Sequence, residues 1–108
     1  MVTKLCLTNI CGHVSTVTAE VGDDGMTTIV NIDTTCEKIK KWGTTFTFPM
    51  ENMMTPCNTT FQENEKNGKL TPTCFIPTVI LNAVWIENGM MSKNLAQKEG
   101  VANIECLE

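Results

Sequence analysis

The sequence predicts a small α+β protein in which a three- to four-stranded, mainly antiparallel sheet carries two helices on one face. Two observations predict this class. Apolar and polar residues alternate over much of the first third of the chain, which is typical of strands, and residues 77–88 form an apolar run of helical length. The chain has 108 residues, enough for one domain with its own core. We expect that domain to span residues 1–106, because Leu107-Glu108 is typical of a cloning remnant.

The first strands are indicated by period-two alternation. Residues 4–9 read as a short strand, and residues 13–21 read as a second one. The Gly-Asp-Asp-Gly sequence at 22–25 is a strong turn signal, and it predicts a returning strand over residues 26–33. We therefore expect a β-hairpin in this part of the chain.

A capping box predicts the first helix directly after the hairpin. Thr34 takes the N-cap position and Glu37 follows three residues later. Ile39 and Trp42 supply an apolar edge at helical spacing, and Gly43 ends the helix. The result is a short helix of about two turns.

The rest of the chain has a less regular pattern. We expect residues 44–73 to form an irregular loop region, with a weak strand over 44–48 and one helical turn over 50–54. The apolar run at 77–88 predicts the second, buried helix. Alternation over residues 101–106 predicts a closing strand.

Composition excludes several classes of function. The net charge is -4, and the basic residues are eight lysines with no arginine, which argues against nucleic-acid binding. No apolar run approaches the roughly 20 residues that a membrane-spanning helix needs. The first residues lack the apolar segment of a secretory signal. We expect a cytoplasmic protein that binds neither nucleic acid nor a membrane. A protein partner is compatible with this composition, which does not indicate the oligomeric state.

Six cysteines are the most informative side chains of this sequence. In a secreted domain of this size, an even count would suggest disulfides. Without a secretory signal, the same count favours metal binding or redox chemistry. We interpret Cys6 and Cys106 as small hydrophobic core residues, because both fall in predicted strands.

Three other cysteines fall at the ends of predicted elements. Cys11 lies in a Cys-Gly break between two strands, Cys36 lies in the first turn of the first helix, and Cys74 lies just before the buried helix. A helix N-terminus favours a thiolate and lowers the pKa of a cysteine. We predict that these three side chains meet at one edge of the sheet.

Thiolates at one place are suited to zinc or to an iron–sulfur cluster. The fourth ligand is either His13, two residues after Cys11, or Cys57 from the loop region. The competing interpretations are that His13 is a surface strand residue and that Cys57 is an incidental loop cysteine. The sequence has no Cys-x-x-Cys pair, so it carries neither a zinc-ribbon nor a thioredoxin-like motif.

Three segments of this chain are similar to segments of known protein families. They are Cys11-Gly12, Thr35-Cys36-Glu37 and Cys74-Phe75-Ile76-Pro77. Together they are similar to a family of short uncharacterised proteins from anaerobes, over nearly the whole chain, and this resemblance implies the plan of elements but no activity. The order of elements also resembles iron–sulfur scaffold proteins of the IscU and NifU type. These also place a Cys-Gly, a hairpin, a cysteine at a helix start and a last cysteine before a long helix.

The spacing in this chain is similar in scale to that of the scaffold proteins. It places 24 residues between the first two of these cysteines and 37 between the second and third. His13 stands where the scaffold proteins have an aspartate, and Thr73 stands where they have a histidine. The segment Glu37-Lys38-Ile39-Lys40 also replaces the small residues that follow the middle cysteine of the scaffold proteins, so the resemblance is one of layout and not of a sequence signature.

These observations lead to three hypotheses about function. The first is a non-catalytic metal- or iron–sulfur-binding protein that acts as a scaffold, carrier or sensor. The second is thiol redox or nucleophile chemistry without a metal, in which Cys36 or Cys74 forms a transient disulfide with Cys11. The third is an interaction domain with inert cysteines. Its partner surface would be an exposed patch made by Phe46, Phe48, Met53 and Met54.

Overall fold

The computed structural model describes residues 2–55 and 59–108 and has an α+β fold. Its elements in chain order are β1 (Thr3–Thr8), β2 (Val14–Val21), β3 (Thr27–Thr34), α1 (Glu37–Trp42), β4 (Thr45–Pro49), the 3₁₀ helix η1 (Met50–Met53), α2 (Thr59–Asn64), α3 (Ile76–Glu87) and α4 (Lys93–Glu99). Among these residues, no helix has the length and apolar character needed to cross a membrane.

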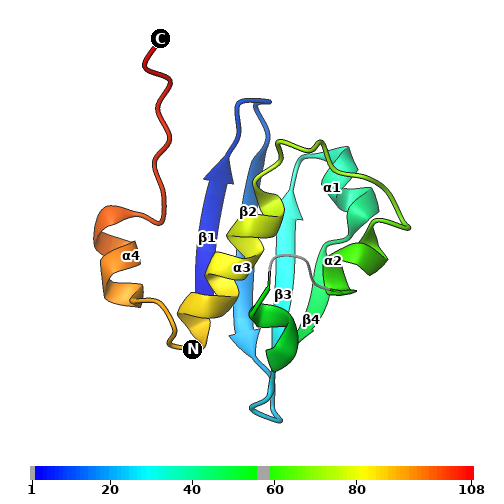
Figure 1. The fold of residues 1–108 in the computed structure, drawn as a ribbon, viewed down its shortest axis with the longest axis vertical. Coiled ribbons are helices and arrows are strands. Elements are labelled where there is room, and N and C mark those ends of the chain that lie inside the picture. The colour runs from blue at the N-terminus through cyan, green and yellow to red at the C-terminus, as the bar shows by residue number, and fades with distance from the viewer. Residues whose placement is uncertain (1, 56–58) are drawn as a thin grey trace.

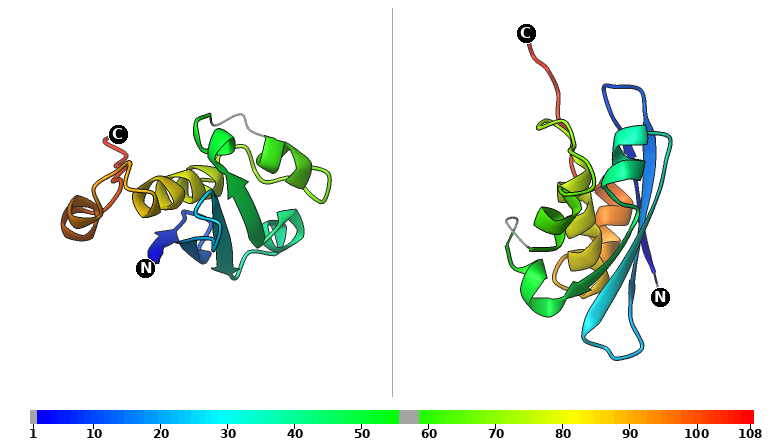
Figure 2. Two further views of the ribbon diagram at one scale, coloured as in Figure 1. Left: turned by 90° about the horizontal axis from the view of Figure 1, so that it is seen from below. Right: turned by 90° about the vertical axis from the view of Figure 1, so that its right-hand side faces the viewer.

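The four strands form one antiparallel sheet in the order β1-β2-β3-β4, as Figure 1 shows. Helix α3 lies across one face of this sheet, over β1 and β2, and α2 lies beside β4 (Figures 1 and 2). Within the described part of the chain, the helices therefore cover one face of the sheet only. The predicted fold class and the predicted hairpin are confirmed, with strand ends shifted by one residue.

Alternate residues of the central strands form the core beneath α3. Val17 pairs with Ile32 and Ala19 pairs with Val30, and all four side chains are buried. The opposite face of the same strands carries more exposed, mostly polar side chains. This division follows from the period-two geometry of a strand. Burial of the apolar face is what holds α3 against the sheet.

An aromatic cluster anchors the second half of the sheet. The ring of Trp42 lies 5.2 Å from Phe46 and 5.6 Å from Phe61, and Phe61 lies 5.5 Å from Phe48, measured between ring centroids. These rings join α1, β4 and α2. The strand expected over residues 44–48 and the helical turn expected over 50–54 are confirmed as β4 and η1. Helix α2 was not predicted, and Phe61 holds it against the cluster, whereas residues 65–73 contain no helix or strand.

The predicted capping box is also wrong. Thr34 is the last residue of β3, where it pairs with Ser15, and its hydroxyl lies 2.8 Å from the Ser15 hydroxyl. The Thr34 hydroxyl also accepts the backbone N–H of Cys36 at 3.1 Å. Strand pairing thus extends past the expected start of the helix, and Cys36 itself is the N-cap of α1.

The end of the chain differs from its expected structure. Residues 101–106 are exposed and do not lie in a strand, because no sheet edge pairs with them. The preceding residues form α4, which the sequence did not predict. Ser92 caps this helix by accepting the Leu95 N–H at 3.1 Å, and Gly100 ends it.

Candidate functional site

Three segments that carry cysteines meet at one end of the sheet. They are the connection from β1 to β2 with Cys11, the start of α1 with Cys36, and the turn before α3 with Cys74 (Figure 1, upper end of the sheet). Strands β1 and β3 run toward this end, and α3 begins at it. The Cys11 side chain is exposed, and those of Cys36 and Cys74 are half-buried.

Two hydrogen bonds join these segments pairwise. His13 Nδ1 lies 2.9 Å from Thr35 Oγ1, which connects the Cys11 segment to the residue before Cys36. Lys38 Nζ donates to Thr71 Oγ1 at 3.2 Å, which connects the start of α1 to the turn before α3. Each cysteine-bearing segment is therefore attached to another by a side-chain contact.

Local backbone geometry presents Cys11 at the tip of its connection. The Asn9 N–H donates to the His13 carbonyl at 3.2 Å, and the Gly12 N–H donates to the Asn9 carbonyl at 2.9 Å. Gly12 has a φ of 87°, a conformation that glycine adopts without strain. The Cys-Gly pair thus makes a tight turn with its thiol toward solvent.

Cys74 is held differently, in the turn that leads into α3. Its N–H donates to the Thr71 carbonyl at 2.8 Å, and Phe75 is the N-cap of the helix. Burial raises the pKa of the Cys74 thiol, and the charges of Cys36 and Cys11 raise it further, whereas a hydrogen bond from the Ile76 N–H lowers it. The expected lowering of this pKa by the helix N-terminus is therefore wrong for Cys74, because desolvation and like charge exceed it.

The three cysteine-bearing segments thus lie at the same end of the sheet. Even so, among residues 2–55 and 59–108, no three His, Cys, Asp or Glu side chains are arranged to hold a metal ion. Cys57, a candidate fourth ligand, lies outside the described residues. His13 lies at the same end of the sheet, with its Nδ1 engaged by Thr35.

The remaining cysteines do not belong to this site or to the core. Cys6 and Cys106 are both exposed, so their interpretation as buried hydrophobic residues is wrong. Cys6 points to the uncovered face of the sheet, opposite Leu5 and Leu7, and Cys106 lies in the terminal segment. The proposed apolar surface patch is wrong as well, because three of its four members, Phe46, Phe48 and Met53, are buried.

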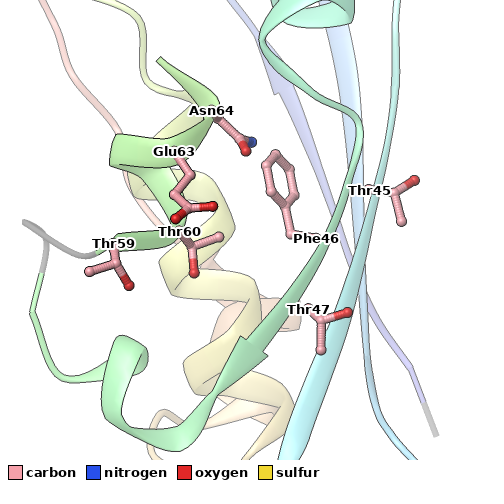
Figure 3. A pocket seen from close by; sticks show the side chains of 7 residues that line it. All are labelled: Thr45, Phe46, Thr47, Thr59, Thr60, Glu63 and Asn64. Atoms are coloured by element: carbon pink, nitrogen blue, oxygen red, sulfur yellow. The ribbon is translucent and has the colours of Figure 1, made fainter. Parts of the chain in front are cut away.

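The structure also contains a cavity that the sequence did not predict. It has a volume of about 380 Å³ and lies between β4 and α2, as Figure 3 shows. Residues 45–47 line one side, and Thr59, Thr60, Glu63 and Asn64 line the other. Its lining is mostly hydroxyl and amide groups with the single carboxylate of Glu63, so it lacks the paired acid and base groups of general catalysis. No signal for it exists in the sequence, because α2 was not predicted.

Comparison with known proteins places the chain in a family. Residues 5–99, which include Cys11, Cys36 and Cys74, match the model of a family described as being of unknown function, DUF6951. The chain belongs to this family. No curated protein and no solved structure gives a significant match. The matched residues include the helices, the cysteine end and all of the sheet except the first two residues of β1, and they leave out the terminal segment after α4.

Proposed function

We propose that this DUF6951 protein binds zinc or an iron–sulfur cluster through the thiolates of Cys11, Cys36 and Cys74, and acts as a non-catalytic scaffold, carrier or sensor. The observation that carries the proposal is that the three cysteine-bearing segments lie at one end of the sheet, joined by the His13–Thr35 and Lys38–Thr71 hydrogen bonds. Soft thiolate ligands select zinc and iron–sulfur clusters over hard cations. The order of elements, which resembles that of IscU- and NifU-type scaffold proteins, supports the same conclusion.

Charge repulsion among the thiolates favours a bound cation. The charges of Cys36 and Cys11 raise the Cys74 pKa, so three thiolates without a counter-ion repel one another. A metal ion converts that repulsion to attraction, and each thiol that becomes a ligand releases its proton to solvent. Because the three sulfurs are not already arranged for coordination, binding includes a rearrangement of side chains at this end.

The fourth ligand is His13 or Cys57. The contact between His13 and Thr35 favours His13 as this ligand. A metal-bound histidine usually donates its second ring N–H to a fixed acceptor, which orients the ring. With the proton on Nδ1 and the hydroxyl of Thr35 as acceptor, Nε2 is left with a free lone pair for the metal.

Thiol chemistry without a metal has weaker support. A nucleophilic cysteine needs a lowered pKa, since the thiolate is the reactive species. Burial and like charge instead raise the pKa of Cys74. A bound metal ion would supply the positive charge that favours deprotonation of Cys74, and this is why we place metal binding ahead of thiol chemistry.

The test is metal analysis of protein purified anaerobically, followed by reconstitution with zinc or with iron and sulfide. We expect one zinc ion or one cluster per chain, and loss of binding when Cys11, Cys36 and Cys74 are all replaced by serine. The matched control replaces Cys6 and Cys106 by serine, which removes the two exposed thiols that are not in the proposed ligand set. Sub-stoichiometric metal after reconstitution, or equal loss in the control, would overturn the proposal.

A further inference from the structure

Two asparagine–glycine pairs lie just after helices of this protein. Asn67-Gly68 follows α2, and Asn88-Gly89 follows α3. Asparagine is a thermolabile residue. A glycine after it has no side chain to hinder the approach of the glycine nitrogen to the asparagine amide. The two pairs share this local chemistry, but they differ in the hydrogen bonds that the fold gives them.

Asn88 is held by its side-chain amide. Its Nδ2 donates to Thr28 Oγ1 at 2.8 Å and to the Val84 carbonyl at 2.8 Å. Thr28 is fully buried in β3, so the first contact anchors Asn88 to the sheet. The Gly89 N–H donates to the Ile86 carbonyl at 3.1 Å. Both groups that would have to react with each other are therefore engaged elsewhere.

Asn67 lies exposed in the turn that follows α2. Its backbone N–H donates to the Asn64 carbonyl at 3.0 Å, which holds the turn but not the side chain. Among residues 2–55 and 59–108, neither the Asn67 side-chain amide nor the Gly68 N–H has a hydrogen-bond partner. The side chain can thus rotate toward the Gly68 nitrogen, and that nitrogen gives up no hydrogen bond when it reacts.

The chain after Asn67 passes close to the end of α1. A Cβ added at Gly68 would lie 3.2 Å from Lys41 Cβ and 3.6 Å from the Trp42 backbone nitrogen. Lys66 and Lys69 flank the pair in sequence. A carboxylate formed at position 67 would therefore enter a lysine-rich part of the surface and reduce its positive charge.

We propose that Asn67 is a site of spontaneous deamidation and that the fold protects Asn88 from the same reaction. The Gly68 nitrogen loses its proton to a base in the solvent and attacks Asn67 Cγ. The new N–Cγ bond closes a succinimide ring, and the Cγ–Nδ2 bond breaks as Nδ2 takes up a proton and leaves as ammonia.

Water completes the reaction by opening the succinimide ring. Attack at Cγ gives aspartate, and attack at the backbone carbonyl carbon of residue 67 gives isoaspartate. In both cases the ring nitrogen regains its proton and again becomes the Gly68 N–H. The overall change consumes one water, replaces a neutral amide with a carboxylate and releases ammonium, so it needs no oxidant and no enzyme.

The isoaspartate product also changes the path of the backbone. Its chain continues through Cγ, which adds a methylene group directly before the close approach of Gly68 to α1. The same connection goes on to Thr71, which accepts from Lys38, and then to Cys74. Modification at position 67 therefore alters the start of the segment that leads to the cysteine end of the sheet.

The test is incubation of the folded wild-type chain at mildly alkaline pH and physiological temperature, with peptide mapping by mass spectrometry over time. We expect progressive loss of the amide at residue 67, with aspartate and isoaspartate as products, while residue 88 keeps its amide. Asn67→Gln should abolish the change in that peptide, because glutamine closes its larger ring far more slowly. A folded chain that retains the Asn67 amide, or that loses the Asn88 amide as fast, would overturn the proposal.

The same incubation in guanidinium chloride with a reductant is the matched control for the role of the fold. Unfolding removes the contacts of Asn88 with Thr28 and Val84 and the contact of Gly89 with Ile86. Both asparagines should then lose their amides at similar rates, since each is followed by glycine. An Asn88 that stays resistant in the unfolded chain would show that these hydrogen bonds are not what protects it.

Discussion

His13 Nδ1 lies 2.9 Å from Thr35 Oγ1, and this contact attaches the Cys11 turn to the residue that precedes Cys36. The two partners come from segments 22 residues apart in sequence. The contact brings a ring nitrogen, an exposed thiol and a half-buried thiol to the same end of the sheet. It thus supports the proposed ligand set and provides a way to perturb that set without removing a ligand.

Replacement of Thr35 by valine removes the hydroxyl that orients His13. We expect zinc affinity to fall by about 10–100-fold, the usual effect of losing a partner of a metal-bound histidine. Competition titration with a chelating dye measures this change. The control is Thr45→Val, which removes an exposed threonine hydroxyl that donates from β4 to the Asn31 side chain of β3. Equal affinities of the two variants would argue against His13 as a ligand.

The raised pKa of Cys74 predicts a pH dependence of stability in the metal-free protein. A thiol whose pKa is raised by folding stabilises the native state while it is protonated in both states, and this contribution is lost as pH rises through the folded pKa. We therefore expect the free energy of unfolding to fall as pH rises above the ordinary thiol pKa of about 8.5. Denaturant unfolding with a reductant and a chelator present measures it.

Cys74→Ala should flatten that dependence, and Cys106→Ala should leave it unchanged because Cys106 is exposed. If the free energy of unfolding falls equally steeply with rising pH in both variants, the effect belongs to groups other than Cys74. In the metal-loaded protein, the free energy of unfolding should instead fall as pH is lowered into the acidic range, because protons compete with the metal for the thiolates. Zinc affinity should accordingly decrease as pH is lowered.

The core under α3 should carry much of the stability. Ile80 is fully buried on this helix, and Ile80→Ala should cost about 2–5 kcal/mol in the free energy of unfolding. Met26 is 68% exposed in the β2–β3 turn, and Met26→Ala should change it by less than about 0.5 kcal/mol. Urea denaturation of the two variants measures both values. Comparable losses would contradict the assignment of Ile80 to the core.

The sequence predicted the elements that bury a continuous apolar face. The hairpin of β2 and β3 has a period of two because each strand buries one face, and helix α3 was recognised as a continuous apolar run of helical length. The positions of Cys11, Cys36 and Cys74 at element ends followed from those boundaries. Successive strands of a meander alternate in direction, so alternate element ends gather at one end of the sheet.

The remaining features lack a local signal. Helix α2 buries Phe61 among its described side chains and α4 buries none, so neither has a helical stripe that periodicity detects. Cys6 alternates with Leu5 and Leu7, and its exposure follows from a sheet covered on one face, which is a property of the tertiary structure. The effect of burial on the Cys74 pKa likewise depends on packing that the sequence does not display.

X-ray absorption spectroscopy of the metal-loaded protein tests the proposed site most directly. For zinc, we predict sulfur ligands at about 2.3 Å, three if His13 is the fourth ligand and four if Cys57 is, and one fewer sulfur after Cys36→Ser. The Cys6→Ser control should keep the wild-type number of sulfur ligands. A first shell of oxygen and nitrogen alone, or a sulfur count that Cys36→Ser leaves unchanged, would contradict a metal site at this end of the sheet.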